Sequence, residues 1–265
     1  MMNRRLLGLA LASPLAAALL APAARAQSLP DLIDRTKPSV VLVGSYGLLD
    51  SPRFGFRGTG FAVGDGLTIV TNAHVLPPET PERIDRHLAV QVWTPGGDWT
   101  PRMAKLITRN PFFDLALLQI DGPPLPALKL AAKPAREGTA IALMGFPLGN
   151  ALGFSHVTHA GIVASRTQIA AAASNFDALN QRAVRQLREG AFEILQLDIT
   201  AYPGNSGGPV LDIATGEVVG VINMVLVKGT KESALSAPSG ISYAVPAAEV
   251  ARLIASPPQP ADPKP

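Results

Sequence analysis

The sequence contains no cysteine, and this absence excludes several kinds of site before any motif is considered. A disulfide scaffold, a thiol nucleophile and a thiolate-bound metal all require that residue. Charged residues are also scarce, at 16%, while apolar residues make up 47% of the 265 positions. This composition excludes a wholly disordered chain. The length suffices for one or two domains with a buried core.

Long apolar runs are absent except for one near the N-terminus. Residues 6–20 are almost wholly apolar, follow Arg4 and Arg5, and precede the small-x-small motif Ala24-Arg25-Ala26. The run is shorter than the ~20 residues that cross a bilayer. Residues 1–26 are therefore predicted to be a cleaved signal peptide rather than a membrane anchor, with the Sec and twin-arginine routes both open. We expect no stable membrane insertion after cleavage, and a periplasmic or secreted protein.

The formal net charge of +3 belongs entirely to that N-terminal segment. The segment holds three of the 23 basic residues and none of the 20 acidic ones, so its removal leaves 20 of each. A formally neutral mature chain with no evident basic patch has little attraction for phosphate backbones. We therefore expect no nucleic-acid partner.

After residue 38 the chain is a series of short β-branched and apolar segments between glycines and prolines, which indicates an all-β barrel or sandwich. Strands are expected at 40–43, 58–63, 68–72, 88–94, 102–109, 115–120, 140–145, 161–166, 194–200, 209–212, 218–227 and 242–245. Short helices are expected at 29–37 and 246–255. Residues 174–189 show helical spacing, either as a cover over a barrel or as an insertion that shapes a site. Half of residues 256–265 are proline, which predicts a disordered tail.

The strongest chemical signal is Gly204-Asn205-Ser206-Gly207-Gly208-Pro209. A nucleophilic serine needs an exposed hydroxyl at a tight turn and nearby N–H groups that receive the oxyanion. Glycines on both sides allow positive φ and a close approach to a substrate carbonyl. Gly204, Asn205 and Ser206 are therefore candidates for the oxyanion hole, with the N–H groups of Gly204 and Ser206 aimed into it. The alternative is a glycine-rich turn with an incidental serine.

Two further motifs supply candidates for the other catalytic roles. His74 follows the apolar strand 68–72, and histidine can take a proton from serine and return it to a leaving group. Asp114 stands before the apolar strand 115–120, where a buried carboxylate needs a partner such as an imidazole N–H. Each residue alone has a plain structural explanation. Their order along the chain, His then Asp then Ser, is that of the chymotrypsin arrangement.

At these residues the sequence resembles the HtrA/Deg group of trypsin-like serine proteases. The resemblance rests on Gly58-Thr59-Gly60-Phe61, Thr71-Asn72-Ala73-His74-Val75, Asp114-Leu115-Ala116-Leu117-Leu118, Asp198, Gly204 to Pro209, 216–221 and 240–246, and it extends from about residue 29 to 254. It implies two six-stranded β-barrels of chymotrypsin type, at roughly 38–125 and 135–245, within one protease domain at 27–255. His74 and Asp114 would come from the first barrel and Ser206 from the second, and no cofactor is needed. Polypeptide substrates, above all unfolded or damaged proteins, and a possible homotrimer are also implied.

The sequence departs from that group in three places. It ends in a proline-rich tail where many members carry PDZ domains, so a member without a PDZ domain is expected. The stretch 167–191, which contains the helix expected at 174–189, is longer than usual. Tyr202 is bulkier than the residue expected before the nucleophile loop.

By position, the specificity pocket should be lined by Ala201, Asn223, Met224 and Val225. This set contains no acid, so a small or medium apolar P1 side chain fits better than a basic one. The same four residues could equally be plain barrel core. His156 and His159 are expected in a surface loop rather than in a metal site, and no metal is expected.

Two other functions remain open at this point. A non-catalytic chaperone or binding module would keep the barrels and bind polypeptides without cleaving them. A serine esterase would use the same three residues on small esters.

Overall fold

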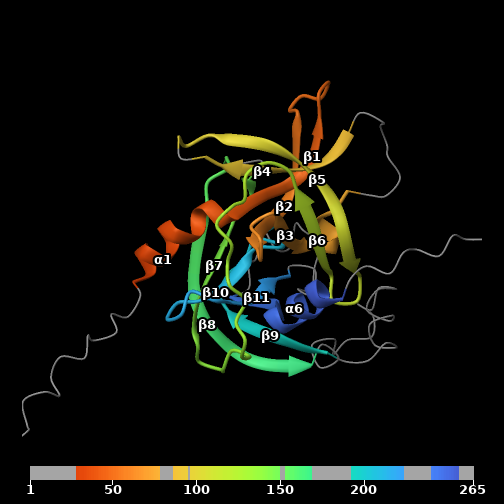
Figure 1. The fold of residues 1–265 in the computed structure, drawn as a ribbon. Coiled ribbons are helices and arrows are strands. Elements are labelled where there is room, and N and C mark those ends of the chain that lie inside the picture. The colour runs from red at the N-terminus through yellow and green to blue at the C-terminus, as the bar shows by residue number, and fades with distance from the viewer. Residues whose placement is uncertain are drawn as a thin grey trace, which may run out of the picture.

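The computed structural model describes residues 28–77, 86–94, 96–149, 153–168, 192–223 and 240–256. Its strands form two closed barrels of six strands each, which follow one another along the chain (Figure 1). This confirms the predicted double barrel of chymotrypsin type. The predicted signal peptide, the helix predicted at 174–189, residues 257–265 of the tail, Met224 and Val225 all lie outside the described residues.

All neighbouring strands within each barrel are antiparallel. The first barrel has the order β1-β2-β3-β6-β5-β4, with β1 (Val40–Gly47), β2 (Phe54–Val63), β3 (Thr68–Asn72), β4 (Arg86–Trp93), β5 (Trp99–Asn110) and β6 (Leu115–Ile120). The second has the order β10-β11-β12-β9-β8-β7, with β7 (Ala140–Gly145), β8 (Val157–Gln168), β9 (Glu193–Asp198), β10 (Pro209–Asp212), β11 (Val218–Ile222) and β12 (Ile241–Pro246). Each predicted strand has a counterpart here, although β11 ends at Ile222 and residues 224–227 of the strand predicted at 218–227 lie outside the described residues.

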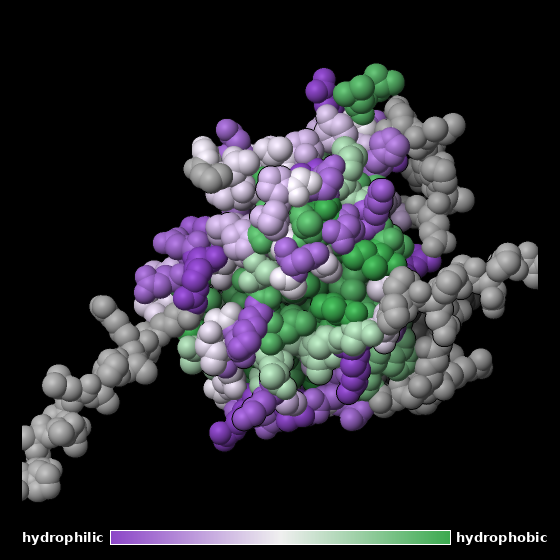
Figure 2. All heavy atoms as spheres, viewed as in Figure 1, coloured by the Kyte–Doolittle hydropathy of each residue, from purple (hydrophilic) through white to green (hydrophobic). Residues whose placement is uncertain are grey.

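Alternate residues of the central strands enter different hydrophobic clusters. In β1, Val41 and Val43 pack inside the first barrel, whereas Leu42 joins a cluster that also holds Met144 and Leu211 of the second barrel. Both faces of such a strand are buried, which is why its sequence is continuously apolar rather than alternating. In Figure 2 apolar side chains gather across the middle of the face, and more hydrophilic ones lie along its lower end and upper left. The two barrels are thus joined by a shared apolar layer.

Two short helices flank the barrels, close to the predicted bounds. Helix α1 (Leu29–Thr36) begins after Ser28, whose hydroxyl accepts from the N–H of Asp31 as an N-cap. Helix α6 (Ala247–Ala255) follows β12 directly and buries Ala247 and Val250. In the described part of the chain, no helix has the length and apolar character needed to span a membrane.

Candidate active site

The expected acid and base lie next to each other at the edge of the first barrel. Strand β3 ends at Asn72 and passes into the 3-10 turn η2 (Ala73–Val75), which carries His74. Asp114 stands directly before β6, whose first residue, Leu115, pairs with Asn72 in the ladder. The strand pairing therefore brings together two residues that are 40 positions apart in the chain.

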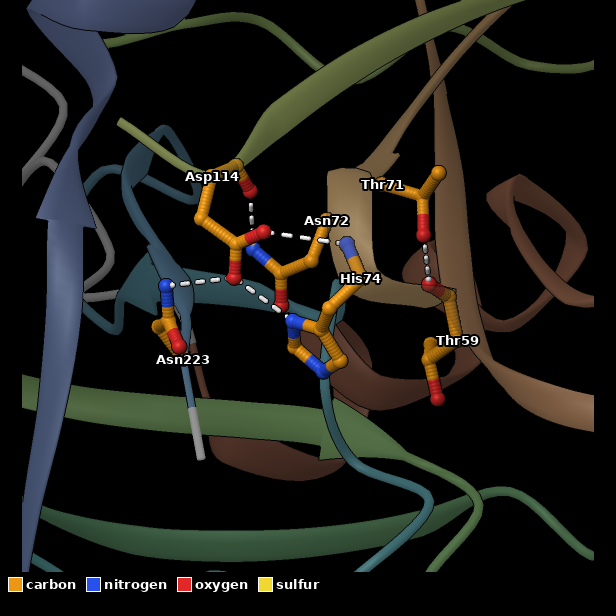
Figure 3. A network of polar contacts seen from close by, with 6 residues as sticks. All are labelled: Thr59, Thr71, Asn72, His74, Asp114 and Asn223. Atoms are coloured by element: carbon orange, nitrogen blue, oxygen red, sulfur yellow. Dashed lines mark hydrogen bonds and ion pairs between the residues drawn. The ribbon is translucent and has the colours of Figure 1, made fainter. Parts of the chain in front are cut away.

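The carboxylate of Asp114 is buried and accepts hydrogen bonds from at least three donors (Figure 3). Its Oδ1 accepts from the backbone N–H of His74 at 2.9 Å, and its Oδ2 lies 2.5 Å from Nδ1 of the same histidine. The side-chain amide of Asn223 donates to Oδ2 at 3.1 Å. An ionised carboxylate can only accept, so Nδ1 carries the proton and Nε2 is the basic nitrogen of the neutral ring.

The backbone of Asp114 is also tied to the histidine turn. Its carbonyl oxygen accepts from the N–H of Ala73 and from the amide of Asn72, both at 3.0 Å. Its φ is +56°, in the left-handed region where Asp is among the few tolerated residue types apart from Gly. Backbone and side-chain bonds together fix the carboxylate against the imidazole, as a residue that orients a catalytic histidine requires.

The loop that carries Ser206 belongs to the second barrel and lies against the histidine segment. A Cβ placed on Gly58 would be 2.9 Å from the carbonyl oxygen of Ser206 and 2.7 Å from Cγ2 of Val75. The two segments therefore meet across Gly58. The Ser206 hydroxyl forms no hydrogen bond with any residue in the described ranges. Catalytic hydrogen bonds are often long or unformed before substrate binds.

Every carbonyl group of the nucleophile loop from Pro203 to Ser206 accepts a hydrogen bond. Pro203 accepts from the N–H of Leu148 at 2.8 Å, Gly204 from Oγ1 of Thr59 at 2.7 Å, Asn205 from the N–H of Gly208 at 2.9 Å, and Ser206 from the N–H of Thr59 at 2.8 Å. Across a trans peptide the N–H points away from the C=O of the same unit. The N–H groups of Gly204 and Ser206 therefore point away from these partners.

The same loop distinguishes the three candidates for the oxyanion hole. The N–H of Asn205 donates to the carbonyl of Tyr202 at 3.0 Å and is occupied. Among the residues that the structure describes, no acceptor pairs with the N–H of Gly204 or of Ser206. Asn205 thus helps to shape the loop, while the other two N–H groups are available to an anion.

Two glycines of this loop adopt backbone conformations that other residues rarely reach. Gly204 has φ +103° and Gly207 has φ +86°. A Cβ at Gly204 would collide with the carbonyl oxygen of Phe146, and one at Gly207 with the carbonyl oxygen of Thr59. Glycine is required at both positions for conformational and for steric reasons.

Two of the four predicted pocket residues lie in the described part of the chain. Ala201 is buried in the core of the second barrel, next to the nucleophile loop. Asn223 is 2% exposed, and it turns its amide toward Asp114 while its N–H donates to the carbonyl of Tyr243 at 2.9 Å. The sequence contained no signal for the contact with Asp114. The pocket itself stays a prediction.

The expectation of a surface loop is wrong for His159, whereas His156 lies in the loop directly before β8 but with a partly buried ring. His159 lies in β8, and the ring of His156 packs against Trp93, Trp99 and Phe146 with centroid distances of 4.8–5.6 Å. Burial lowers the pKa of both histidines, which are therefore neutral near pH 7. Among the described residues, no group of three or more His, Cys, Asp or Glu is arranged to hold a metal ion.

Known proteins are similar to this chain in sequence. Residues 58–221, more than half of the chain, match the family model described as a trypsin-like peptidase domain. A probable periplasmic serine endoprotease, DegP-like, from Pseudomonas fluorescens is 31% identical over 71% of this chain and 32% of its own length. The mitochondrial serine protease HTRA2 of Bos taurus is 31% identical over 89% of this chain and 44% of its own.

A solved structure gives the same fold. The serine endoprotease from Yersinia pestis matches with a TM-score of 0.58 at 23% identity, covering 86% of this chain and 65% of that one. The present chain spans less than half the length of the two relatives named above, 32% and 44%. The family model and the double barrel agree, and the chain belongs to the trypsin-like peptidase family.

Proposed function

We propose that the protein is a serine endopeptidase with Ser206 as nucleophile, His74 as general base and acid, and Asp114 as the residue that orients the imidazole. The observation that carries the proposal is the pairing of buried Asp114 with Nδ1 of His74 beside a loop that presents two unpaired N–H groups. A structural histidine or an incidental serine would not need this arrangement.

The chemistry follows from the placement of these groups. His74 Nε2 takes the proton of Ser206 as Oγ attacks the peptide carbonyl carbon, and the oxyanion is received by the N–H groups of Gly204 and Ser206. Asp114 stabilises the imidazolium that forms. When the C–N bond breaks, Nε2 gives its proton to the leaving amine. Water then attacks the acyl-enzyme, His74 removes its proton, and the carboxylic acid product leaves with Ser206 restored.

Asn223 is part of the same proposal as a positioning residue. It donates to the carboxylate oxygen that faces His74 Nδ1, and both partners are buried, at 2% exposure each. A hydrogen bond to a buried charged group is worth more than one between neutral groups. The amide therefore holds Asp114 in the orientation that the imidazole needs.

The proposed substrates are unfolded or damaged polypeptides, and the proposed location is the periplasm or the exterior of the cell. The names of the DegP-like relatives support the location, together with the apolar N-terminal segment. Assembly into a homotrimer belongs to the same proposal. A small or medium apolar P1 side chain is proposed because the predicted pocket contains no acid that would pair with lysine or arginine.

The test has two parts, with Ser206→Ala as the matched control. A fluorophosphonate probe should label the wild-type protein and leave the variant unlabelled, because only an activated serine reacts. Denatured casein should be degraded by the wild type alone, with mass spectrometry showing cuts mostly after small or medium apolar residues.

Three results would contradict parts of the proposal. An unlabelled wild-type protein that still suppresses aggregation of denatured substrate would favour a non-catalytic chaperone. Turnover of small esters without casein degradation would favour an esterase. Cuts mostly after Lys or Arg would refute the proposed apolar pocket while leaving the peptidase intact.

A further inference from the structure

Thr59 of β2 is in contact with the nucleophile loop through both its backbone and its side chain. It is fully buried in the first barrel, yet its N–H donates to the carbonyl of Ser206 at 2.8 Å and its Oγ1 donates to the carbonyl of Gly204 at 2.7 Å. The second bond joins residues 145 positions apart, from different barrels. One residue therefore holds the loop on both sides of Asn205, with its side chain at Gly204 and its backbone N–H at Ser206.

The direction of the hydroxyl proton follows from its other partner. The N–H of Phe146 donates to the same Oγ1 at 3.3 Å, so the hydroxyl accepts there and its single proton is directed to Gly204. Thr71 donates its own hydroxyl to the carbonyl of Thr59 at 2.7 Å, which Figure 3 shows beside the His74 site. The β-branched side chain of Thr59 has few rotamers to choose from. Its hydroxyl is thus held in one orientation.

The nucleophile loop needs such an external restraint because Gly204 supplies none. With φ +103° and no Cβ, the Gly204 backbone can rotate into other conformations at little cost. Rotation of the Pro203–Gly204 peptide would turn the Gly204 N–H out of the oxyanion hole. The Pro203–Gly204 peptide, which carries this N–H, is held by the bond from Leu148 to the Pro203 carbonyl. Thr59 holds the following peptide through the Gly204 carbonyl, so that the two bonds together fix the backbone on both sides of the Gly204 Cα.

We propose that Thr59 is a positioning residue of the oxyanion hole: its hydroxyl fixes the Gly204 carbonyl and, together with the Leu148 bond to Pro203, keeps the Gly204 backbone in the conformation that aims its N–H at the substrate oxyanion. This inference rests on the proposed peptidase function and adds to it a residue of the first barrel that neither reacts nor touches substrate. It also gives the Gly58-Thr59-Gly60-Phe61 motif a role: Gly58 leaves room for the nucleophile loop, and Thr59 holds that loop by hydrogen bonds.

The experiment compares Thr59→Val, which keeps the shape and the backbone N–H but removes the hydroxyl, with Thr59→Ser, which retains the hydroxyl. Ser242→Ala is the matched control, because Ser242 is another buried hydroxyl that donates to a backbone carbonyl, that of Ile199, at 2.8 Å. The full chain is assayed for kcat and KM on a peptide taken from a casein cut site, and thermal unfolding is followed in parallel.

Loss of an oxyanion donor lowers kcat by about 10²–10³-fold. Because Thr59 acts through Gly204, Thr59→Val should lower kcat by about 10- to 100-fold with KM nearly unchanged, and Thr59→Ser should restore most of it. Ser242→Ala should lower the unfolding midpoint by a similar amount without this loss of kcat. If Thr59→Val does not fold, Thr59→Ala against Thr59→Ser provides the same comparison.

Wild-type kcat in a folded Thr59→Val or Thr59→Ala protein would overturn the proposal. The proposal would also be overturned if Ser242→Ala lost as much kcat as the Thr59 variant for the same loss of stability. Thr59 would then contribute only to the stability of the fold. A wild-type protein that cleaves nothing and resists the fluorophosphonate would instead refute the peptidase function, which is a separate and recognisable failure.

Discussion

Replacing Asn223 by leucine, whose side chain has the same branching of heavy atoms, removes one donor from the Asp114 carboxylate. The lost bond is 3.1 Å long and fully buried, and a hydrogen bond to a charged group contributes about 1.5–3 kcal/mol. If all of that energy were lost in the transition state, kcat would fall about 10- to 150-fold, because 1.36 kcal/mol is a factor of ten. The carboxylate keeps both bonds to His74, so we expect the lower end, about tenfold.

The assay for Asn223→Leu measures kcat and KM on two peptides that differ only at P1. Positioning of Asp114 predicts the same loss of kcat for both peptides, because the triad acts alike on either. A pocket-lining role predicts instead a change in KM or in the ratio between the two peptides. Wild-type kcat in the folded variant, or a loss confined to one peptide, would refute the positioning role. Ser242→Ala again reports the effect of a buried polar truncation that does not touch the carboxylate.

Two more predictions concern the loop and the histidines. Gly204→Ala should lower kcat at least about 100-fold, because its Cβ would collide with the Phe146 carbonyl and displace an oxyanion donor. Gly138→Ala, with φ +82° and open space around the Cβ, is its control and should lose only about 1–3 kcal/mol of stability with activity intact. Equal activity of the two variants would contradict this. The depressed pKa of His156 means that the unfolded chain binds its proton first, so stability should fall as pH drops below about 6.5 and continue to fall down to the folded-state pKa. His156→Gln, which keeps a donor for the Val40 carbonyl, should flatten this pH dependence of urea unfolding, and an unchanged slope would refute the role of His156.

Much of the fold follows from local sequence patterns. The β-branched run at 40–43 and the apolar segments at 68–72 and 115–120 predicted β1, β3 and β6, because such side chains suit strands buried on both faces. The prediction for β5 was too short: the strand runs from Trp99 to Asn110 and is largely polar and half-exposed. Its hydrogen-bonded pairing with β4 and β6 continues where the apolar pattern stops. The length of such a strand therefore depends on its neighbours and could not be predicted from its own sequence.

For the candidate site, too, the sequence predicted some features and not others. Ser206, His74 and Asp114 could be named as candidates from their residue types, their neighbours and their order in the chain, because each proposed role needs a particular functional group. Their spatial partners could not be named. The amide of Asn223 could as well have faced a pocket, and His156 could have been solvated, because the local sequence does not tell which distant groups a side chain will meet.

By itself the sequence determined the chemistry that this protein can attempt: a hydroxyl nucleophile without any thiol, an imidazole, a carboxylate, and glycines where the backbone must turn. It also determined the strand pattern that closes two barrels. Only the tertiary structure decided that Thr59 of one barrel holds the nucleophile loop of the other, and that Asn223 supports Asp114 from 109 positions away. Hydrogen bonds between residues so far apart in the chain depend on how the two barrels pack. That packing is set by the shared apolar layer rather than by any local motif.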